Sequence, residues 1–505
     1  MIKTASAEPA AGLPQRPQRV ADKIARRRLR SASWGFAAAW GLFFTIAYLL
    51  PVPQGLSPAG MGVLAVVVWA AIMWITEAIP AGVSGILIPM LLVLGVGNTF
   101  PLAASGFATP VVFICLTAFI FAALMQAAGL DRRIALSLLV WFKAKTVNGV
   151  IWAMFAVNIM LSLIIPAANS RAATMLPVIN GICSFFDDTK QGRNAQKAIV
   201  IQTLVYGSMI SGMCILTAHL PNYILVNLFA KDLKLSISYT HWFVLQWPYL
   251  GLFVITQWWV QFYFKTRGLG VKDGYAAVEK VHQQLPETSR SEWLMLAIFA
   301  AVGLGWMLEP FHKVDSHTVA LLGLAVMFAP GLLTFKWKDV QDRTIWGTLL
   351  LLAGALSLSA AMTSSGLAKW LADHIHSGAF GHPWWAILLI MMVGTHIVRI
   401  GMLSNVAAIT MLAPILVTLA PALGLHPVAF TMLVADTDSF AYLLPTQITA
   451  AVIAYSSGTF SMADYFKVGS VSVVIAIAYG ILIMAYWYAY LGVPVWDPAT
   501  PWPFK

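Results

Sequence analysis

Long apolar segments separated by short polar loops make up most of this 505-residue chain. From residue 34 onward the apolar runs reach about 20 residues, the length that a helix needs to cross the hydrocarbon core of a bilayer. This pattern predicts an all-α polytopic membrane protein with about eleven transmembrane helices. The expected spans are residues 34–52, 59–79, 82–98, 108–128, 198–230, 240–264, 292–309, 317–335, 345–364, 428–456 and 467–491.

Two further apolar segments, residues 147–182 and 384–419, each contain a polar cluster. Polar backbone at bilayer depth is tolerated only where protein or a water-filled cavity supplies its hydrogen bonds. We therefore expect two re-entrant hairpins, each with a positive helix N-terminus at its tip. Two such tips would form a binding site for an anion. Their candidate binding residues are Asn169, Ser170 and Arg171 in the first tip, within residues 164–177, and Ser404 and Asn405 in the second tip, within residues 400–414.

Two of the expected spans are interrupted by helix breaks. The first break, residues 216–223, reads LTAHLPNY, and its Pro221 removes a backbone donor and restricts the preceding residue. The second break, residues 443–450, reads LLPTQITA. An imidazole in the first break could donate to an anion or bond a helix end. The breaks add Thr217, His219, Asn222, Thr446 and Thr449 to the candidate substrate-binding residues.

The same order of parts occurs twice along the chain: a span, an interfacial helix that starts with Gly-Leu, a hairpin and a broken span. An odd number of spans separates corresponding parts, so the second copy would be inverted, as in many secondary transporters. The expected organisation is a basic cytoplasmic tail, a first repeat, a linker, a second repeat and an external tail. These are residues 1–31, 32–264, 265–291, 292–491 and 492–505.

Composition supports membrane insertion, because 59% of the residues are hydrophobic and only 10% are charged, against about 25% charged in soluble domains. Much of the net charge of +11 lies in the first 30 residues. This placement indicates a cytoplasmic amino terminus in a bacterial inner membrane rather than a nucleic-acid partner. The sequence has no HExxH, GxSxG, P-loop or Cys/His cluster. We therefore expect neither an enzyme nor a cofactor or metal site.

Several charged residues stand inside apolar segments, where charges usually face a cavity or one another. Arg399 is expected to pair with Asp436 or Asp438, although either carboxylate could instead couple transport to protons. A cation/proton antiporter that uses one of these two residues is therefore an alternative function. Glu77 is expected to be structural, because it lies far from both tips in sequence and would cap the third span.

Some segments resemble the divalent anion:sodium symporter family, which carries dicarboxylates, tricarboxylates and sulfate. They include TEAIPAGVSGILIP (76–89), SMISGMCILTAHLPN (208–222), SNVAAITMLAP (404–414) and SFAYLLP (439–445). The resemblance implies a homodimer in the lipid bilayer, in which a transport domain moves as an elevator against a scaffold domain. It also implies a small dicarboxylate or related dianion as substrate and Na⁺ as a possible coupling ion. A sulfate or sulfonate transporter remains an alternative.

The sequence departs from this family at the sites of sodium coupling. Sodium-coupled members have Ser-Asn-Thr at both tips, whereas Val406 follows Asn405 here and Ala168 precedes Asn169. Since hard cations need oxygen ligands, sodium coupling is doubtful and exchange is plausible. The candidate cation-coupling residues are Asn169, Asn405, Asp436 and Asp438. Arg171 resembles the exchanger branch of the family, and its guanidinium could bind a carboxylate bidentately or stand in place of a cation.

Overall fold

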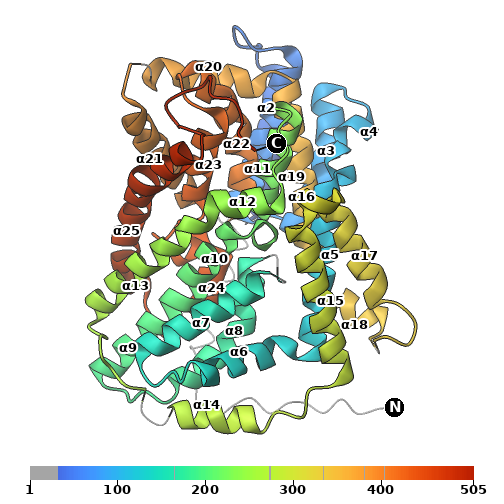
Figure 1. The fold of residues 1–505 in the computed structure, drawn as a ribbon. Coiled ribbons are helices and arrows are strands. Elements are labelled where there is room, and N and C mark those ends of the chain that lie inside the picture. The colour runs from blue at the N-terminus through green and yellow to red at the C-terminus, as the bar shows by residue number, and fades with distance from the viewer. Residues whose placement is uncertain are drawn as a thin grey trace.

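The structure is a computed structural model that describes residues 32–163, 165, 167–271, 274–333, 335–379, 381–402 and 404–504. The expected basic tail, residues 1–31, lies outside this part of the chain. All named elements of the described residues are helical (Figure 1). The predicted all-α membrane fold class is therefore confirmed.

Eight helices among the described residues are long and apolar enough to cross a membrane. They are Ala32–Leu49, α2 (Pro58–Thr76), α5 (Pro110–Ala128), Lys190–Cys214, α19 (Trp346–Ser364), α21 (Trp384–Gly401), α22 (Asn405–Ala422) and Met462–Tyr490. Three shorter apolar helices are α3 (Ala81–Val96), α7 (Val147–Ser162) and α17 (Ser316–Met327). This set differs from the expected eleven spans, because it includes both arms of the second hairpin and because some expected spans form shorter helices.

The remaining helices complete the hairpins, the broken spans and the segments that join them. They are α4 (Phe100–Ala103), α6 (Leu130–Trp141), α8 (Ala168–Cys183), α9 (Lys190–Val200), α10 (Ser208–Cys214), α11 (Leu220–Asp232), α12 (Tyr239–Gln246), α13 (Leu250–Phe264), α14 (Gly274–Gln283), α15 (Arg290–Met307), α16 (Glu309–His312), α18 (Trp337–Gln341), α20 (Leu367–Ala379), α23 (Pro427–Asp438), α24 (Thr449–Ser456), α25 (Met462–Tyr479) and α26 (Ala485–Tyr490). A π-helical turn, Ile201–Gly207, joins α9 to α10. Helix α14 lies within the expected linker.

Two glycines separate spans from the amphipathic helices that follow them. Gly129 between α5 and α6 and Gly366 between α19 and α20 both have left-handed backbone, with φ of 71° and 79°. This conformation strongly favours glycine and ends an α-helix. Figure 1 shows α6 and α14 lying across one end of the bundle and α20 across the opposite end.

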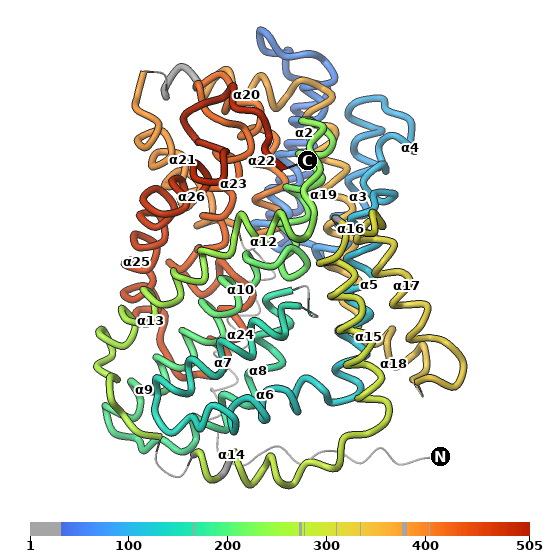
Figure 2. The backbone as a smooth tube through the Cα atoms, in the orientation of Figure 1, coloured from blue at the N-terminus to red at the C-terminus, as the bar shows by residue number. Residues whose placement is uncertain are grey.

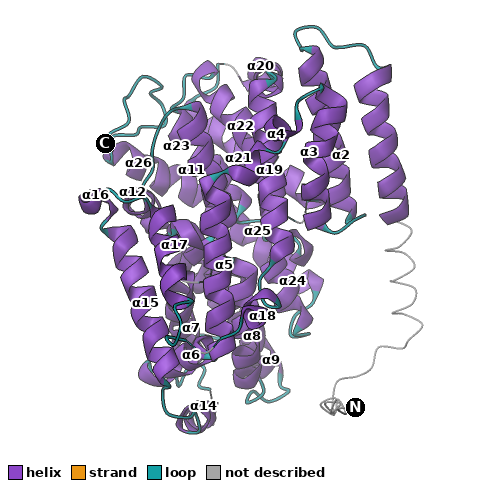
Figure 3. Cartoon of the chain, turned by 90° about the vertical axis from the view of Figure 1, so that its right-hand side faces the viewer, coloured by secondary structure: helices purple, strands orange, loops and turns teal. Residues whose placement is uncertain are grey.

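Helices from distant parts of the chain pack into two groups. Helix α3 packs against α2 and α19, and Figure 3 shows α2 and α3 side by side near one edge of the molecule. In the other group, α24 packs against α8 and α10 packs against α7. The second broken span therefore lies beside the first hairpin, as the tube in Figure 2 also shows.

The close contact of α3 with α19 allows a stability prediction. A Cβ atom at Gly85 would overlap the backbone of Leu350 and Leu351 in α19, whereas a Cβ at Gly303 in α15 would meet no atom within 4 Å. We expect Gly85→Leu to destabilise the fold by about 1–3 kcal/mol, the usual cost of overpacking. Thermal unfolding in detergent measures this effect, with Gly303→Leu as the control. Equal melting temperatures for the two variants would contradict the prediction.

Candidate functional site

A cavity of about 580 Å³ opens where the two hairpin tips, the two helix breaks and the loop after α2 meet. The N-terminal ends of α8 and α22 both face it, as the sequence predicts for an anion site. Of the expected site residues, five line this cavity: Asn169, His219, Ser404, Asn405 and Thr449. The other five, Ser170, Arg171, Thr217, Asn222 and Thr446, are not among its lining residues.

The two tips present their helix N-termini differently. Ser404 precedes α22, and its hydroxyl accepts a hydrogen bond from the N–H of Ala407. Ala167 precedes α8 and has no side-chain oxygen with which to cap that helix. Among the described residues no side chain caps α8, so its first-turn N–H groups are available to a ligand. Together with the partial positive charge of a helix N-terminus, they favour an anion in the cavity.

Arg171 is fully buried behind the first tip. Its Nη1 donates to the carbonyl oxygens of Ile165 at 2.7 Å and Ala218 at 2.8 Å, and its Nη2 donates to that of Ser208 at 2.6 Å. These three oxygens belong to the first tip, the first break and the start of α10. The guanidinium thus joins the tip to the break through backbone carbonyls.

Arg399 makes a similar arrangement behind the second tip. It is also fully buried, and it donates to the carbonyl oxygens of Met402 and Gln447 and to the side-chain oxygen of Asn405. Its Nε lies 2.9 Å from Oδ1 of the buried Asp438. A second guanidinium therefore joins the second tip to the second break, and the predicted pairing of Arg399 with Asp438 is confirmed.

Asp436 lies in a different environment from Asp438, although both stand near the end of α23. Its two carboxylate oxygens accept hydrogen bonds from Nε2 of Gln246 at 3.1 and 2.9 Å. No described cation forms an ion pair with Asp436. The alternative pairing of Arg399 with Asp436 is therefore not observed.

His219 links the two halves of the site. Its Nε2 lies 3.1 Å from the hydroxyl of Ser439 and 3.4 Å from Nδ2 of Asn405. The first break therefore contacts the second tip. Asn222 instead donates to the carbonyl oxygens of Gly212 and Ile215, which satisfies the free backbone acceptors of the broken helix.

Three other expected site residues lie away from the cavity. Thr217 is buried and its hydroxyl has no partner among the described residues. Ser170 follows the lining residue Asn169 in the first turn of α8 and is half-buried. Thr446 is exposed in the second break, three residues before Thr449, which does line the cavity.

Glu77 is a lining residue that the sequence analysis missed. It ends α2 with left-handed backbone, φ 48°, and it lines the cavity with the loop that follows. The start of α3 is preceded by Pro80 and has no side-chain cap, so the expected capping role of Glu77 is wrong. Glu77 belongs to the segment TEAIP, which is part of the family resemblance. That resemblance was the feature of the sequence that could have identified Glu77 as a site residue.

The chain is similar in sequence to known proteins over most of its length. Residues 32–493 match the protein family described as "Sodium:sulfate symporter transmembrane region". A curated membrane protein of Cupriavidus necator is 28% identical over 479 residues, which cover 90% of this chain and 93% of that protein. The sodium-dependent dicarboxylate transporter SdcS of Staphylococcus aureus is 27% identical over 451 residues, covering 85% of this chain and 86% of SdcS.

A solved structure resembles the chain in fold. The Alcanivorax borkumensis YdaH transporter superposes with a TM-score of 0.53 at 15% identity, covering 87% of this chain and 100% of that one. At this level of identity, the likeness concerns the fold alone.

Proposed function

Because this chain belongs to the sodium:sulfate symporter transmembrane-region family of membrane transporters, we propose that it is a secondary active transporter of small dicarboxylate dianions that does not require sodium. The observation that carries the proposal is the pair of buried guanidinium groups behind the hairpin tips. Backbone carbonyl oxygens at a helix break are the ligands that Na⁺ would need. Here the guanidinium groups of Arg171 and Arg399 donate hydrogen bonds to such oxygens in place of a cation.

The cavity suits a small organic dianion. Its volume of about 580 Å³ falls within the range of roughly 300–1,000 Å³ that is usual for small-molecule sites. Two helix N-termini, one on each side, could each meet one carboxylate of the substrate. The name of SdcS agrees with this substrate class, although that relative is sodium-dependent.

We propose an elevator-type alternating access for this transport, with exchange of dianions as its mode. The cavity is lined on one side by Glu77 and by Thr348 of α19, and on the other by both tips. It therefore lies between the two groups of helices, where a relative displacement would expose it to either side. Homodimeric assembly, the inverted repeats and a cytoplasmic amino terminus in a bacterial inner membrane remain predictions.

Sulfate transport and cation/proton antiport are the competing functions. Sulfate is supported by the description of the family, and it should then compete with the dicarboxylate for the cavity. Proton coupling would fall to Asp436 rather than Asp438, because the latter is already paired with Arg399. Proton-linked sodium flux without any need for a carboxylate would support the antiporter.

Uptake of labelled succinate into proteoliposomes tests the proposal. We expect the same rate when choline replaces sodium, and a faster rate when the vesicles contain unlabelled dicarboxylate. A steep dependence on sodium would contradict the sodium-independent part. Stronger competition by sulfate than by succinate would contradict the proposed substrate.

Two threonines provide a matched pair of variants for the same assay. Thr449 lines the cavity, whereas Thr446 is exposed elsewhere in the second break. We expect Thr449→Ala to weaken succinate transport by about tenfold, as for the loss of one hydrogen bond to a charged ligand. Thr446→Ala should transport at the normal rate. The reverse order would show that the substrate binds outside this cavity.

A further inference from the structure

A second cavity lies at the end of the bundle formed by α6 and α14. It has a volume of about 900 Å³ and is lined by residues of α6, α8 and α14, by the end of α5 and by the segment after α8. We call it the α6–α14 groove. Figure 1 shows α6 following the lower end of α5 and α14 lying below α6. Because α5 is a membrane-spanning helix and α6 is amphipathic, the groove should lie at the bilayer interface.

One part of the groove is apolar and open. It is lined by Val178 and Ile182 of α8, by Val278 and Val281 of α14 and by Phe185. Phe185 and Val281 are 37% and 36% exposed. Exposed apolar surface favours coverage by another apolar group. An acyl chain of a neighbouring lipid has the right chemistry and comes from the adjacent bilayer.

The other part of the groove carries one acid and one base. Asp131 and Arg132 both line it, at the start of α6. The Asp131 carboxylate accepts a hydrogen bond from the backbone N–H of Arg132 at 2.8 Å. Burial raises the pKa of Asp131 above its ordinary value, although this and other hydrogen bonds oppose the rise. A cationic ligand group would stabilise the charged form of this carboxylate.

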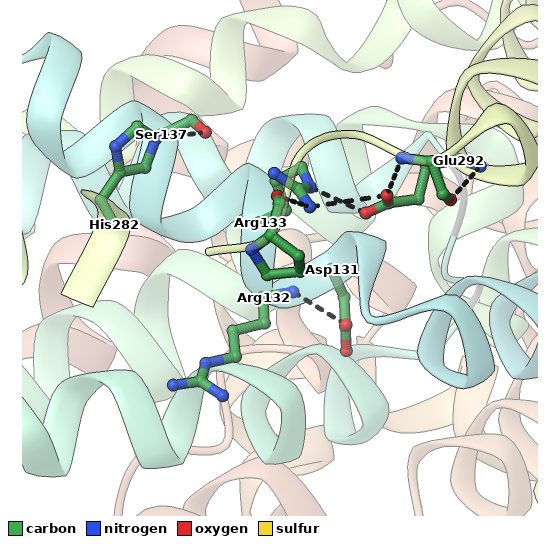
Figure 4. Close-up of polar contacts among 8 residues, drawn as sticks. Asp131, Arg132, Arg133, Ser137, His282 and Glu292 are labelled. Carbon is green, nitrogen blue, oxygen red and sulfur yellow. Dashed lines mark hydrogen bonds and ion pairs between the residues drawn. The ribbon is translucent and has the colours of Figure 1, made fainter. Parts of the chain in front are cut away.

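Arg132 differs from its neighbour Arg133, because its guanidinium makes no hydrogen bond or ion pair with any residue that the structure describes. Arg133 donates to Glu292 at 2.7 Å and to the carbonyl of Pro286 at 2.8 Å, so it fixes α6 to the start of α15. Figure 4 shows the Arg132 side chain pointing away from that pair, with its guanidinium outside the dashed contacts. No ion pair among the described residues includes Asp131 or Arg132. Asp131 is held by neutral donors, the N–H of Arg132 and the side chain of Thr174, so a cationic ligand group would meet a carboxylate that no described cation pairs with.

We propose that the α6–α14 groove is a binding site for a phospholipid whose head group carries both a phosphate and a primary ammonium, as in phosphatidylethanolamine. Arg132 binds the phosphate, Asp131 accepts hydrogen bonds from the ammonium, and an acyl chain covers Val178, Phe185 and Val281. A choline head group has no N–H to donate, and a glycerol head group has no positive charge for Asp131. The same helix, α8, begins at the substrate cavity, so this lipid contacts an element of that site.

Native mass spectrometry of the purified full-length protein in mixed-lipid nanodiscs tests this site. We expect phosphatidylethanolamine to be retained about tenfold more than phosphatidylcholine, the ratio for one charge-assisted hydrogen bond. The double variant Asp131→Asn/Arg132→Gln should lose this preference. The control Asp188→Asn/Arg193→Gln changes the same residue types at an exposed ion pair of 2.8 Å and should keep it.

A second variant tests the apolar part without changing any charge. A Cβ at Gly181, which lines the groove from α8, would meet no atom within 4 Å. Gly181→Leu should project a side chain into the apolar part of the groove and reduce retention of phosphatidylethanolamine about tenfold, whereas Gly303→Leu should not. Equal retention of phosphatidylcholine by the unaltered protein, stronger retention of phosphatidylglycerol, or an unchanged preference in the Asp131→Asn/Arg132→Gln variant would each overturn the proposal.

Discussion

Replacing Arg171 with alanine should abolish dicarboxylate transport in proteoliposomes. The change removes the donor shared by the carbonyl oxygens of Ile165, Ser208 and Ala218. A buried polar group left without a partner costs about 1–3 kcal/mol, so the first tip would lose its attachment to the first break. It also removes the buried positive charge that we propose to stand in place of Na⁺. Transport at the normal rate would remove Arg171 from the mechanism.

The same variant allows a direct test of the cation-substitute hypothesis. Without the guanidinium, the three carbonyl oxygens surround a space with the ligand chemistry of a sodium site. We expect Na⁺ to raise the melting temperature of Arg171→Ala relative to choline, because a ligand that binds only the folded state stabilises it. The unaltered protein should show no such shift. Arg193→Ala, which changes an exposed arginine, is the control for loss of charge alone.

Replacing Asp438 with asparagine should destabilise the fold by about 3–5 kcal/mol, the usual cost of removing one partner of a buried ion pair. The variant would leave the buried guanidinium of Arg399 without its counter-charge. Asp436→Asn is the matched control two residues earlier. Its partners are neutral groups, the amide of Gln246 and the side chains of Tyr249 and Tyr488. Asparagine keeps one oxygen for them, so we expect a smaller loss of about 1–3 kcal/mol.

Denaturant unfolding in detergent measures both stabilities, and transport at several pH values measures the function of each carboxylate. A larger loss for Asp436→Asn than for Asp438→Asn would contradict the assigned roles. Loss of proton-coupled transport in a folded Asp436→Asn variant would favour the antiporter hypothesis.

The meeting of the two tips could be predicted because polar clusters are costly in apolar segments. Asn169, Ser404 and Asn405 interrupt sequence that would otherwise span a bilayer, and all three line the cavity. The position of polar residues in apolar segments could not distinguish residues that line the cavity from residues that bond the free carbonyl oxygens at a helix break. Asn222, for example, is also a polar residue in an apolar segment, but it bonds across the break to the carbonyl oxygens of Gly212 and Ile215 at the end of α10.

Long-range partners were harder to predict than the elements that carry them. Glu77 lies far from both tips in sequence, and only the packing of α2 and α3 beside α19 brings it to the cavity. Periodicity shows which face of a helix is apolar, but it does not show which helix that face meets. Arg399 pairs with Asp438 and not with Asp436, and this too depends on the packing around the end of α23.

The contact of His219 with Ser439 and Asn405 restricts how the pocket can open. A gate that moved the second tip away from the first break, which Arg171 joins to the first tip, would have to break the hydrogen bond between His219 and Asn405. We therefore expect the tips to stay together throughout a turnover. The whole pocket would then move as a unit to become exposed to either side of the membrane. Each cycle would carry one substrate molecule, unlike the continuous flow through a channel.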